Sequence, residues 1–300
     1  MKMTRRQALF LGAVPLLAQA RPRVAITMDD VRWEIIPEDH RAEAEARLLE
    51  HLGKTRAFLF AVGQYVDNEH GSQILTNWTA AGHLIGNHTY NHQTLSGNVG
   101  PAEFEQGILR TDEILRKYTG FRRCFRFPAL KEGATPEVRD RFRSFLALHG
   151  YRNGAVTIDC SDWYYNQRLL ARTEANRHFD VTLFRQPYLD HVWNRAQFYD
   201  QLSRDVLGRS VAHTLLVHYN LLNSLFLGDL LTMFRSAGWE IIDADDAFSD
   251  RVFACQPNTA PAGESLIWAL AKETGRFENR LRYPGEDDTY EKPILDQLRL

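Results

Sequence analysis

The sequence is poor in cysteine, and Cys124, Cys160 and Cys255 follow no spacing typical of a zinc finger or a disulfide framework. We expect all three to be small buried side chains. No stretch combines clustered basic residues with aromatic ones, and the formal net charge is −2, so nothing indicates nucleic-acid binding. No apolar run reaches the roughly 20 residues that a membrane-spanning helix needs. We therefore expect neither a nucleic-acid partner nor a membrane span.

The first twenty residues are typical of an export signal. Three positive charges within the first six residues precede an apolar run from Ala8 to Leu17, and Ala18-Gln19-Ala20 has the form of a cleavage site. Residues 4–10 resemble a twin-arginine signal, with an ordinary secretory signal or an irregular start as the alternatives. We expect an exported protein, periplasmic or extracellular, whose residues 21–300 form a single domain.

Beyond this segment, strand-like apolar runs alternate with helical patterns. The predicted strands are 24–28, 57–62, 83–87, 124–127, 155–158, 214–217 and 239–242, and the predicted helices are 41–52, 72–81, 101–118, 136–148, 167–177, 195–207, 225–237 and 265–274. Such alternation predicts an α/β fold with a parallel sheet. About seven units suit an irregular (β/α) barrel, with an open doubly wound sheet as the alternative. No glycine-rich phosphate loop follows the first strand, which argues against a dinucleotide-binding fold.

Polar residues gather at the ends of the predicted strands, and in a barrel such ends share one mouth. They are Asp29-Asp30, His88 and His92, Arg126, Asp159 with Asp162-Trp163, and His218. Adjacent carboxylates repel unless a positive charge shares the site, so a divalent metal on one would leave the other free as a base. Taken singly, each acid pair or histidine is as well explained by a solvated loop, a helix cap or a core position.

The two histidines stand four residues apart, which on a helical turn places both rings on one face. Two imidazoles and a carboxylate leave an open position for water, as catalytic zinc sites require. Arg126 lies in an otherwise apolar strand and needs a carboxylate partner such as Asp29, or forms a purely structural ion pair. Asp162 and Trp163 suit an orienting acid and an aromatic wall, or a turn followed by a core indole.

Five segments together resemble the polysaccharide deacetylase family, which carries the NodB homology domain (carbohydrate esterase family 4). They occur in the family's order over roughly residues 22–245. They are Thr27-Met28-Asp29-Asp30, His88-Thr89-Tyr90-Asn91-His92, Arg126-Phe127-Pro128, Asp159-Cys160-Ser161-Asp162-Trp163 and Leu216-Val217-His218. The second and fourth are the most specific.

The resemblance implies a distorted (β/α) barrel of about seven strands, NodB-like, that removes N-acetyl groups from a glycan with the help of a divalent metal. Zinc is favoured, and cobalt and manganese also suit the ligands. The implied roles are metal ligation by Asp30, His88 and His92, general base for Asp29, general acid for His218, support by Arg126 and Asp162, and substrate contact by Trp163, Pro128 and Ala129.

The chain departs from the family pattern at several places. Met28 and Val31 stand where the first motif usually has Phe and Gly, and Ala129 stands where the third often has Tyr. Residues 164–212 are long for the family and predict an inserted, substrate-shaping segment, and a helical extension follows at the C-terminus. Two rival functions remain open, a metal-dependent esterase or amidase acting on a non-sugar substrate and a non-catalytic glycan-binding protein.

Overall fold

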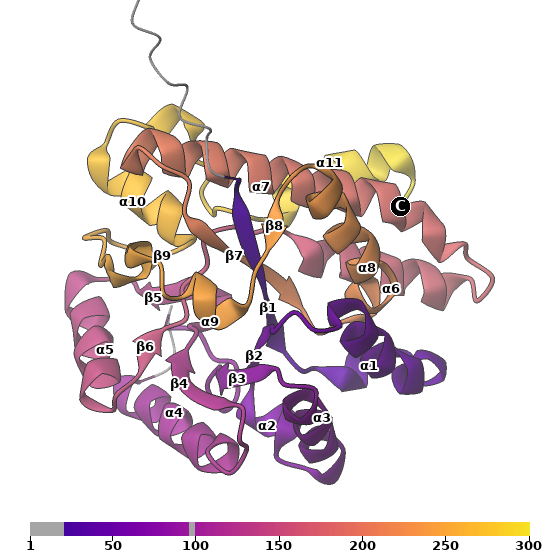
Figure 1. The fold of residues 1–300 in the computed structure, drawn as a ribbon, viewed down its shortest axis with the longest axis horizontal. Helices are drawn as coiled ribbons and strands as arrows, with labels where there is room; N and C mark the ends of the chain where they lie inside the picture. The colour runs from indigo at the N-terminus through magenta and orange to yellow at the C-terminus, as the bar shows by residue number, and fades with distance from the viewer. Residues whose placement is uncertain (1–20, 96–99) are drawn as a thin grey trace, which may run out of the picture.

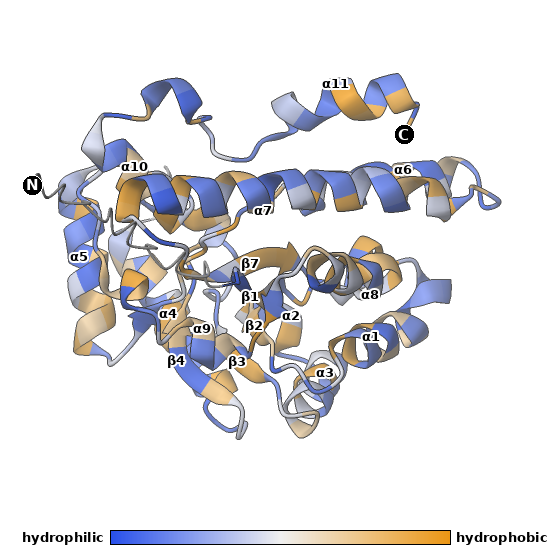
Figure 2. Ribbon diagram, turned by 45° about the horizontal axis from the view of Figure 1, so that its top comes forward, coloured by the Kyte–Doolittle hydropathy of each residue, from blue (hydrophilic) through white to orange (hydrophobic). Residues whose placement is uncertain are grey.

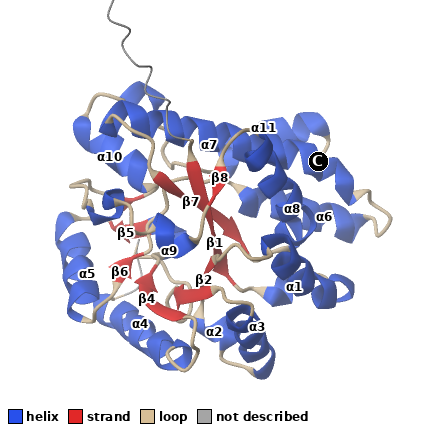
Figure 3. Cartoon of the chain, in the orientation of Figure 1, coloured by secondary structure: helices blue, strands red, loops and turns tan. Residues whose placement is uncertain are grey.

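A computed structural model describes residues 21–95 and 100–300, so the predicted export signal lies outside the described residues. Seven parallel strands form the central sheet (Figure 3). They are β1 (Arg23–Asp30), β2 (Phe58–Ala61), β3 (Leu84–Asn87), β4 (Phe121–Phe125), β6 (Arg152–Asn153), β7 (Ala212–His218) and β8 (Glu240–Ile241). A separate antiparallel pair joins β5 (Lys131–Gly133) to β9 (Ala262–Gly263).

Helices surround the sheet, as Figure 1 shows. They are α1 (Glu38–Leu52), α2 (Gly63–Val66), α3 (Glu69–Ala80), α4 (Pro101–Leu115), α5 (Pro136–Leu148), α6 (Asp162–Ala175), α7 (Arg185–Leu207), α8 (Leu221–Ser236), α9 (Ala244–Ala247), α10 (Leu266–Thr274) and α11 (Asp288–Leu298). Within the described residues, none of these helices is long and apolar enough to cross a membrane.

The strand order explains why the site residues meet. The sheet runs β6-β4-β3-β2-β1-β7, so successive strands step in one direction and β7 returns beside β1. This progression is that of a curled barrel and not of an open doubly wound sheet. Residues Val24 to Asp29 of β1 are all buried, as expected for a strand covered on both faces. The predicted distorted barrel is therefore confirmed.

The barrel closes through an irregular segment, where one predicted strand is wrong. Residues 155–158 form no strand, and only Ile158 makes a β-bridge, to Leu215 of β7. The Thr157 hydroxyl accepts a hydrogen bond from the Thr214 amide at 2.8 Å, in place of a backbone carbonyl. A side-chain hydroxyl that competes for ladder hydrogen bonds interrupts the strand.

The segment from α6 to α7 and the C-terminal residues pack together on one side of the barrel. α7 begins ten residues before the predicted start at 195, and α11 lies in the predicted C-terminal helical extension, for which no helix beyond residue 274 was specified. Figure 2 shows α6, α7 and α11 as neighbouring helices. Cys124 and Cys160 are buried as expected, but Cys255 is exposed. That expectation was wrong because Cys255 follows a short 3₁₀ helix, Arg251–Ala254, in extended backbone at the surface.

Candidate active site

The end of β1 makes a sharp left-handed turn that presents two carboxylates. Asp30 and Val31 have φ angles of 83° and 62°. A β-branched residue at positive φ is strained, which explains why the family pattern has glycine at the position of Val31. This chain makes the turn without a glycine. Asp29 and Asp30 therefore point toward the loop that follows β3.

The two histidines follow β3 in a loop, not on the helical turn suggested by their spacing. Thr89 and His92 have φ angles of 63° and 55°, and this loop still brings the His88 and His92 rings to 4.9 Å between centroids. Asp30 Oδ1 lies 3.5 Å from His88 Nε2 and 3.3 Å from His92 Nε2. One ligand atom from each of these three residues lies within 4.8 Å of the others.

The protonation states of this group suit a divalent cation. The His88 Nδ1–H donates to the Arg126 carbonyl at 2.8 Å, which leaves Nε2 with a free lone pair. Burial lowers the pKa of His92 to about 4, so this ring is neutral at pH 7. Burial opposes ionisation of Asp30, but the neighbouring imidazoles of His88, His92 and His218 hold its pKa below the usual value. Asp30 Oδ1 is buried and has no hydrogen-bond partner among the described residues, as expected of a metal ligand.

Asp29 is held from the opposite side by a buried guanidinium. Arg126 Nη1 donates to Asp29 Oδ1 at 2.6 Å and to the Thr27 hydroxyl at 2.9 Å. Arg126 Nε donates to the Gly154 carbonyl at 2.7 Å, and its guanidinium lies 4.0 Å from the centroid of the Phe60 ring. The second carboxylate oxygen of Asp29 lies 3.6 Å from His88 Nε2. Asp29 is therefore fixed in orientation with one oxygen facing the histidines.

His218, at the end of β7, is paired with Asp29 in the strand register and bonded to Asp162. Its Nδ1–H donates to Asp162 Oδ1 at 2.7 Å, and its amide donates to Oδ2 at 2.8 Å. Burial disfavours the charged ring, but Asp162, Asp30 and Asp29 together raise the pKa of His218 to about 10. The imidazole is thus protonated at neutral pH, with Nε2–H available to the mouth.

Two asparagines complete the surroundings of Asp162, and sequence reasoning missed both. Asn223 Nδ2 donates to Asp162 Oδ2 at 2.8 Å, and Asn220 Nδ2 donates to the same oxygen at 3.3 Å. Asn220 is the N-cap of α8, where its side chain accepts from the Asn223 amide. Asn220 lies five residues before the predicted helix start at 225 and was an available cap signal.

The three predicted substrate-binding residues differ in their exposure to solvent. Trp163 is 39% exposed at the first turn of α6, beside Asp162. Pro128 is buried, whereas Ala129 is exposed with a φ of 49°, and its N–H makes no hydrogen bond to any described residue. Asp159 lies outside the Asp30–histidine group and accepts from the Cys160 amide at 2.9 Å.

The comparison with known families agrees with this geometry. Residues 18–154 match the sequence profile of the polysaccharide deacetylase family. These residues belong to the polysaccharide deacetylase family. The match ends before Asp162 and His218, so the pairing of these two residues is established by the structure alone. No curated protein sequence shows significant similarity to the chain.

Solved structures of the same fold include a pseudoenzyme of carbohydrate esterase family 4 and a peptidoglycan deacetylase. The pseudoenzyme BA3943 of Bacillus anthracis is 16% identical, with a TM-score of 0.53 over 76% of this chain and 66% of that one. The peptidoglycan deacetylase PdaC of Bacillus subtilis is 19% identical, with a TM-score of 0.51 over 76% of this chain and 90% of that one. At these identities the likeness establishes the fold alone.

Proposed function

We propose that the protein is an exported, metal-dependent hydrolase that removes N-acetyl groups from a polysaccharide or oligosaccharide. The observation that carries this proposal is the close grouping of Asp30, His88 and His92 beside Asp29 and His218. A base candidate, an acid candidate and three ligands at one mouth are the parts that amide hydrolysis needs.

Asp30, His88 and His92 would hold the divalent cation, and zinc suits two neutral imidazoles and a carboxylate, as do cobalt and manganese. A cation bound there polarises the amide carbonyl and lowers the pKa of nearby water. Asp29, fixed by Arg126, takes the proton from the attacking water. The free N–H of Ala129 suits the developing oxyanion, so the missing tyrosine side chain leaves this contact intact.

His218 then gives its Nε2 proton to the leaving amine, because Asp162 holds Nδ1 and keeps the ring charged. The exposed face of Trp163 suits stacking against a sugar ring. Acetamido sugars of peptidoglycan, chitin-like oligomers or an exopolysaccharide all present the required amide.

The presence of inactive relatives makes catalysis a point to test, since fold alone does not imply function. BA3943 is described as a pseudoenzyme. In this chain Asp29, Asp30, His88, His92 and His218 are all present and grouped, which supports an active enzyme.

The first experiment is acetate release from N-acetylglucosamine oligomers and from O-acetylated glycans, each with and without a chelator. We expect release from the N-acetyl substrates that the chelator abolishes and added zinc restores. Faster release from O-acetyl substrates would favour an esterase. A glycan that binds without any acetate release would favour a binding protein.

Two variants separate the base from the ligands. Asp29→Asn keeps the shape of the side chain but cannot take a proton, so turnover should fall by about 10²-fold or more while metal content is retained. His88→Ala should lose metal and turnover together, because it removes a ligand. Zinc content and acetate release are measured on the same preparations. Full activity in Asp29→Asn would refute its assignment as the base.

A further inference from the structure

A second group of side chains that could bind a metal ion lies outside the proposed active site. The group consists of His191 of α7, Glu286 just before α11, and Glu291 of α11, and one ligand atom from each lies within 4.8 Å of the others. His191 and Glu291 are buried, and His191 Nδ1 lies 3.2 Å from Glu291 Oε2. Nothing in the proposed reaction uses these residues, so their arrangement needs its own explanation.

The contacts of this group argue against a second metal. His191 Nε2 accepts a hydrogen bond from the Ser161 amide at 2.9 Å, so the ring proton must be on Nδ1, where it points to Glu291. A metal on Nδ1 would force a proton onto Nε2 and set it against the Ser161 N–H. Arg195 is 2.5 Å from Glu286, and Arg282 is 3.5 Å from Glu291. These guanidinium groups already neutralise the two carboxylates.

The Ser161 amide connects this group to the catalytic end of α6. Ser161 is the N-cap of α6, and its side chain makes no capping hydrogen bond. The next residue, Asp162, is fully buried and is the partner of His218. The imidazole of His191 therefore accepts a hydrogen bond from the backbone N–H of Ser161, which directly precedes the carboxylate that orients the general acid.

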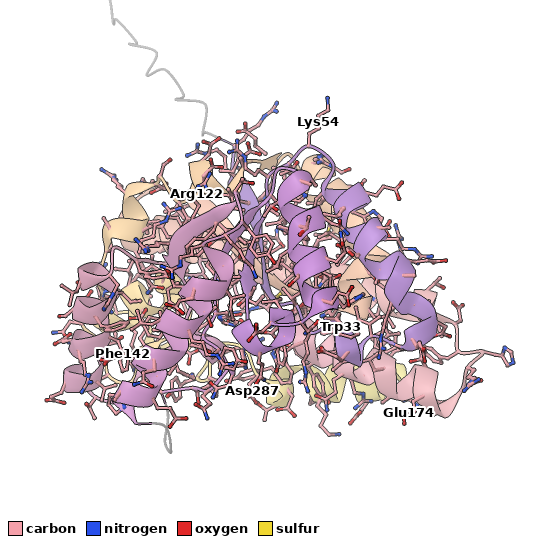
Figure 4. The ribbon with its side chains drawn as sticks, turned by 90° about the horizontal axis from the view of Figure 1, so that it is seen from below. Trp33, Lys54, Arg122, Phe142, Glu174 and Asp287 are labelled. Atoms are coloured by element: carbon pink, nitrogen blue, oxygen red, sulfur yellow. The ribbon has the colours of Figure 1, made fainter. Side chains whose placement is uncertain are left out.

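Packing reinforces this connection. The His191 ring stacks on Tyr165 of α6, with centroids 5.0 Å apart and planes at 29°. Burial alone would raise the pKa of Glu291, but the His191 hydrogen bond and nearby Arg282 and Arg195 hold that pKa below its usual value. Glu291 is thus a buried, ionised acceptor that fixes the tautomer of His191. Figure 4 shows Asp287, just before α11, on the same side of the molecule as Trp33, which follows β1.

We propose that His191 and Glu291 are positioning residues, and that through them α11 fixes the start of α6 and hence the Asp162–His218 pair. The order of contacts is Glu291, His191, the Ser161 amide, and then Asp162. Asp162 accepts four hydrogen bonds within 3.3 Å, so a small shift of the α6 start disturbs all of them at once. This inference rests on the proposed role of His218 as general acid.

His191→Phe is the test variant, because phenylalanine keeps the stack on Tyr165 but can neither accept from Ser161 nor donate to Glu291. Glu291→Gln retains an acceptor for His191 Nδ1–H and serves as the conservative change. Asp296→Asn is the matched control, since Asp296 also joins α11 to α6, through Arg168 at 2.8 Å, but far from Asp162 along the helix. All variants are made in the full chain.

We expect His191→Phe to lower kcat by about tenfold, a part of what a general acid supplies, with little change in KM or zinc content. The alkaline limit of its pH–rate profile should move to lower pH, because a displaced Asp162 stabilises the imidazolium of His218 less. The titratable groups that face His218 are Asp162, Asp30, Asp29, Asp159 and His92. Glu291→Gln should keep most of the activity, and Asp296→Asn should change neither kcat nor the alkaline limit.

A second readout does not depend on any substrate. The ¹⁵N NMR titration of the His218 ring should show a lower pKa in His191→Phe than in the parent chain and in Asp296→Asn. An unchanged His218 titration in a folded His191→Phe protein would overturn the proposal that His191 and Glu291 position Asp162 and His218. A shifted titration in a protein that releases no acetate from any glycan would support this positioning role and refute the proposed reaction instead.

Discussion

At the scale of single residues, one buried guanidinium determines the shape of the site. The side chains of Arg126 and Asp29 are 1% and 3% exposed, and their contact is 2.6 Å long. Removing one partner of a buried pair leaves an uncompensated charge, which typically costs about 3–5 kcal/mol. The same contact that fixes the proposed base is therefore also a stability determinant.

Arg126→Met should consequently destabilise the protein by about 3 kcal/mol, because methionine can pack on Phe60 but leaves Asp29 unpaired. Adding Asp29→Asn to Arg126→Met should recover at least half of that loss, since the buried charge is gone. Urea unfolding of the two single variants, the double variant and the parent chain gives the coupling energy. If the free-energy losses of the two single variants add up to the loss of the double variant, the coupling energy is zero and the ion pair itself contributes no stability.

The site residues that could be predicted from sequence are those whose side-chain type allows few kinds of interaction partner. A lone arginine in a predicted apolar strand needs a carboxylate, and paired acids at a strand end need a cation, so Arg126, Asp29 and Asp30 were found. Asn223 and His191 were not, because an asparagine or histidine in a helix has many possible partners. Only the packing of α6 against α8 and α7 selects Asp162 and the Ser161 amide for them.

At the scale of elements, strand positions were predicted well where burial is continuous and poorly where side chains compete with the backbone. β1, β2 and β3 match their apolar runs to within two residues. Residues 155–158 have an equally strand-like composition, but the hydroxyl of Thr157 accepts the hydrogen bond of the Thr214 amide. The pattern of hydrophobic residues does not report such a local hydrogen bond.

The turn between α3 and β3 contains a histidine that should make stability depend on pH. His83 is buried, its Nδ1 accepts from the Ala57 amide at 3.2 Å, and its ring lies 4.8 Å from that of Trp78. Burial lowers the pKa of His83 to about 4, against about 6.5 in an unfolded chain. As the pH falls below 6.5 the unfolded chain binds a proton that the folded chain refuses, so stability decreases down to about pH 4.

His83→Asn keeps an acceptor near the position of Nδ1 and does not titrate. Between pH 7 and pH 4.5 the parent chain should therefore lose about 2 kcal/mol more unfolding free energy than His83→Asn does. Urea unfolding of both proteins at the two pH values measures this difference. Parallel losses in the two proteins would exclude His83 as the titrating group.

At the scale of the whole molecule, the fold gathers residues from distant parts of the chain at one end of a curled sheet. The strand order places β1 between β2 and β7, so the ends of these strands bring Asp30 and His218 to the same mouth. The sequence pattern predicted this architecture because parallel strands share their carboxyl ends. It predicted a helical extension at the C-terminus but not the position of α11, whose contacts with α7 appear only in the folded molecule.

The central claim is that Asp30, His88 and His92 bind one divalent cation. The most direct test is anomalous diffraction at the zinc edge from crystals of the full chain grown with zinc. We predict one strong peak about 2.0–2.2 Å from Asp30 Oδ1, His88 Nε2 and His92 Nε2. Crystals whose anomalous map shows no peak among these three atoms, at a zinc concentration that saturates the protein, would contradict the account.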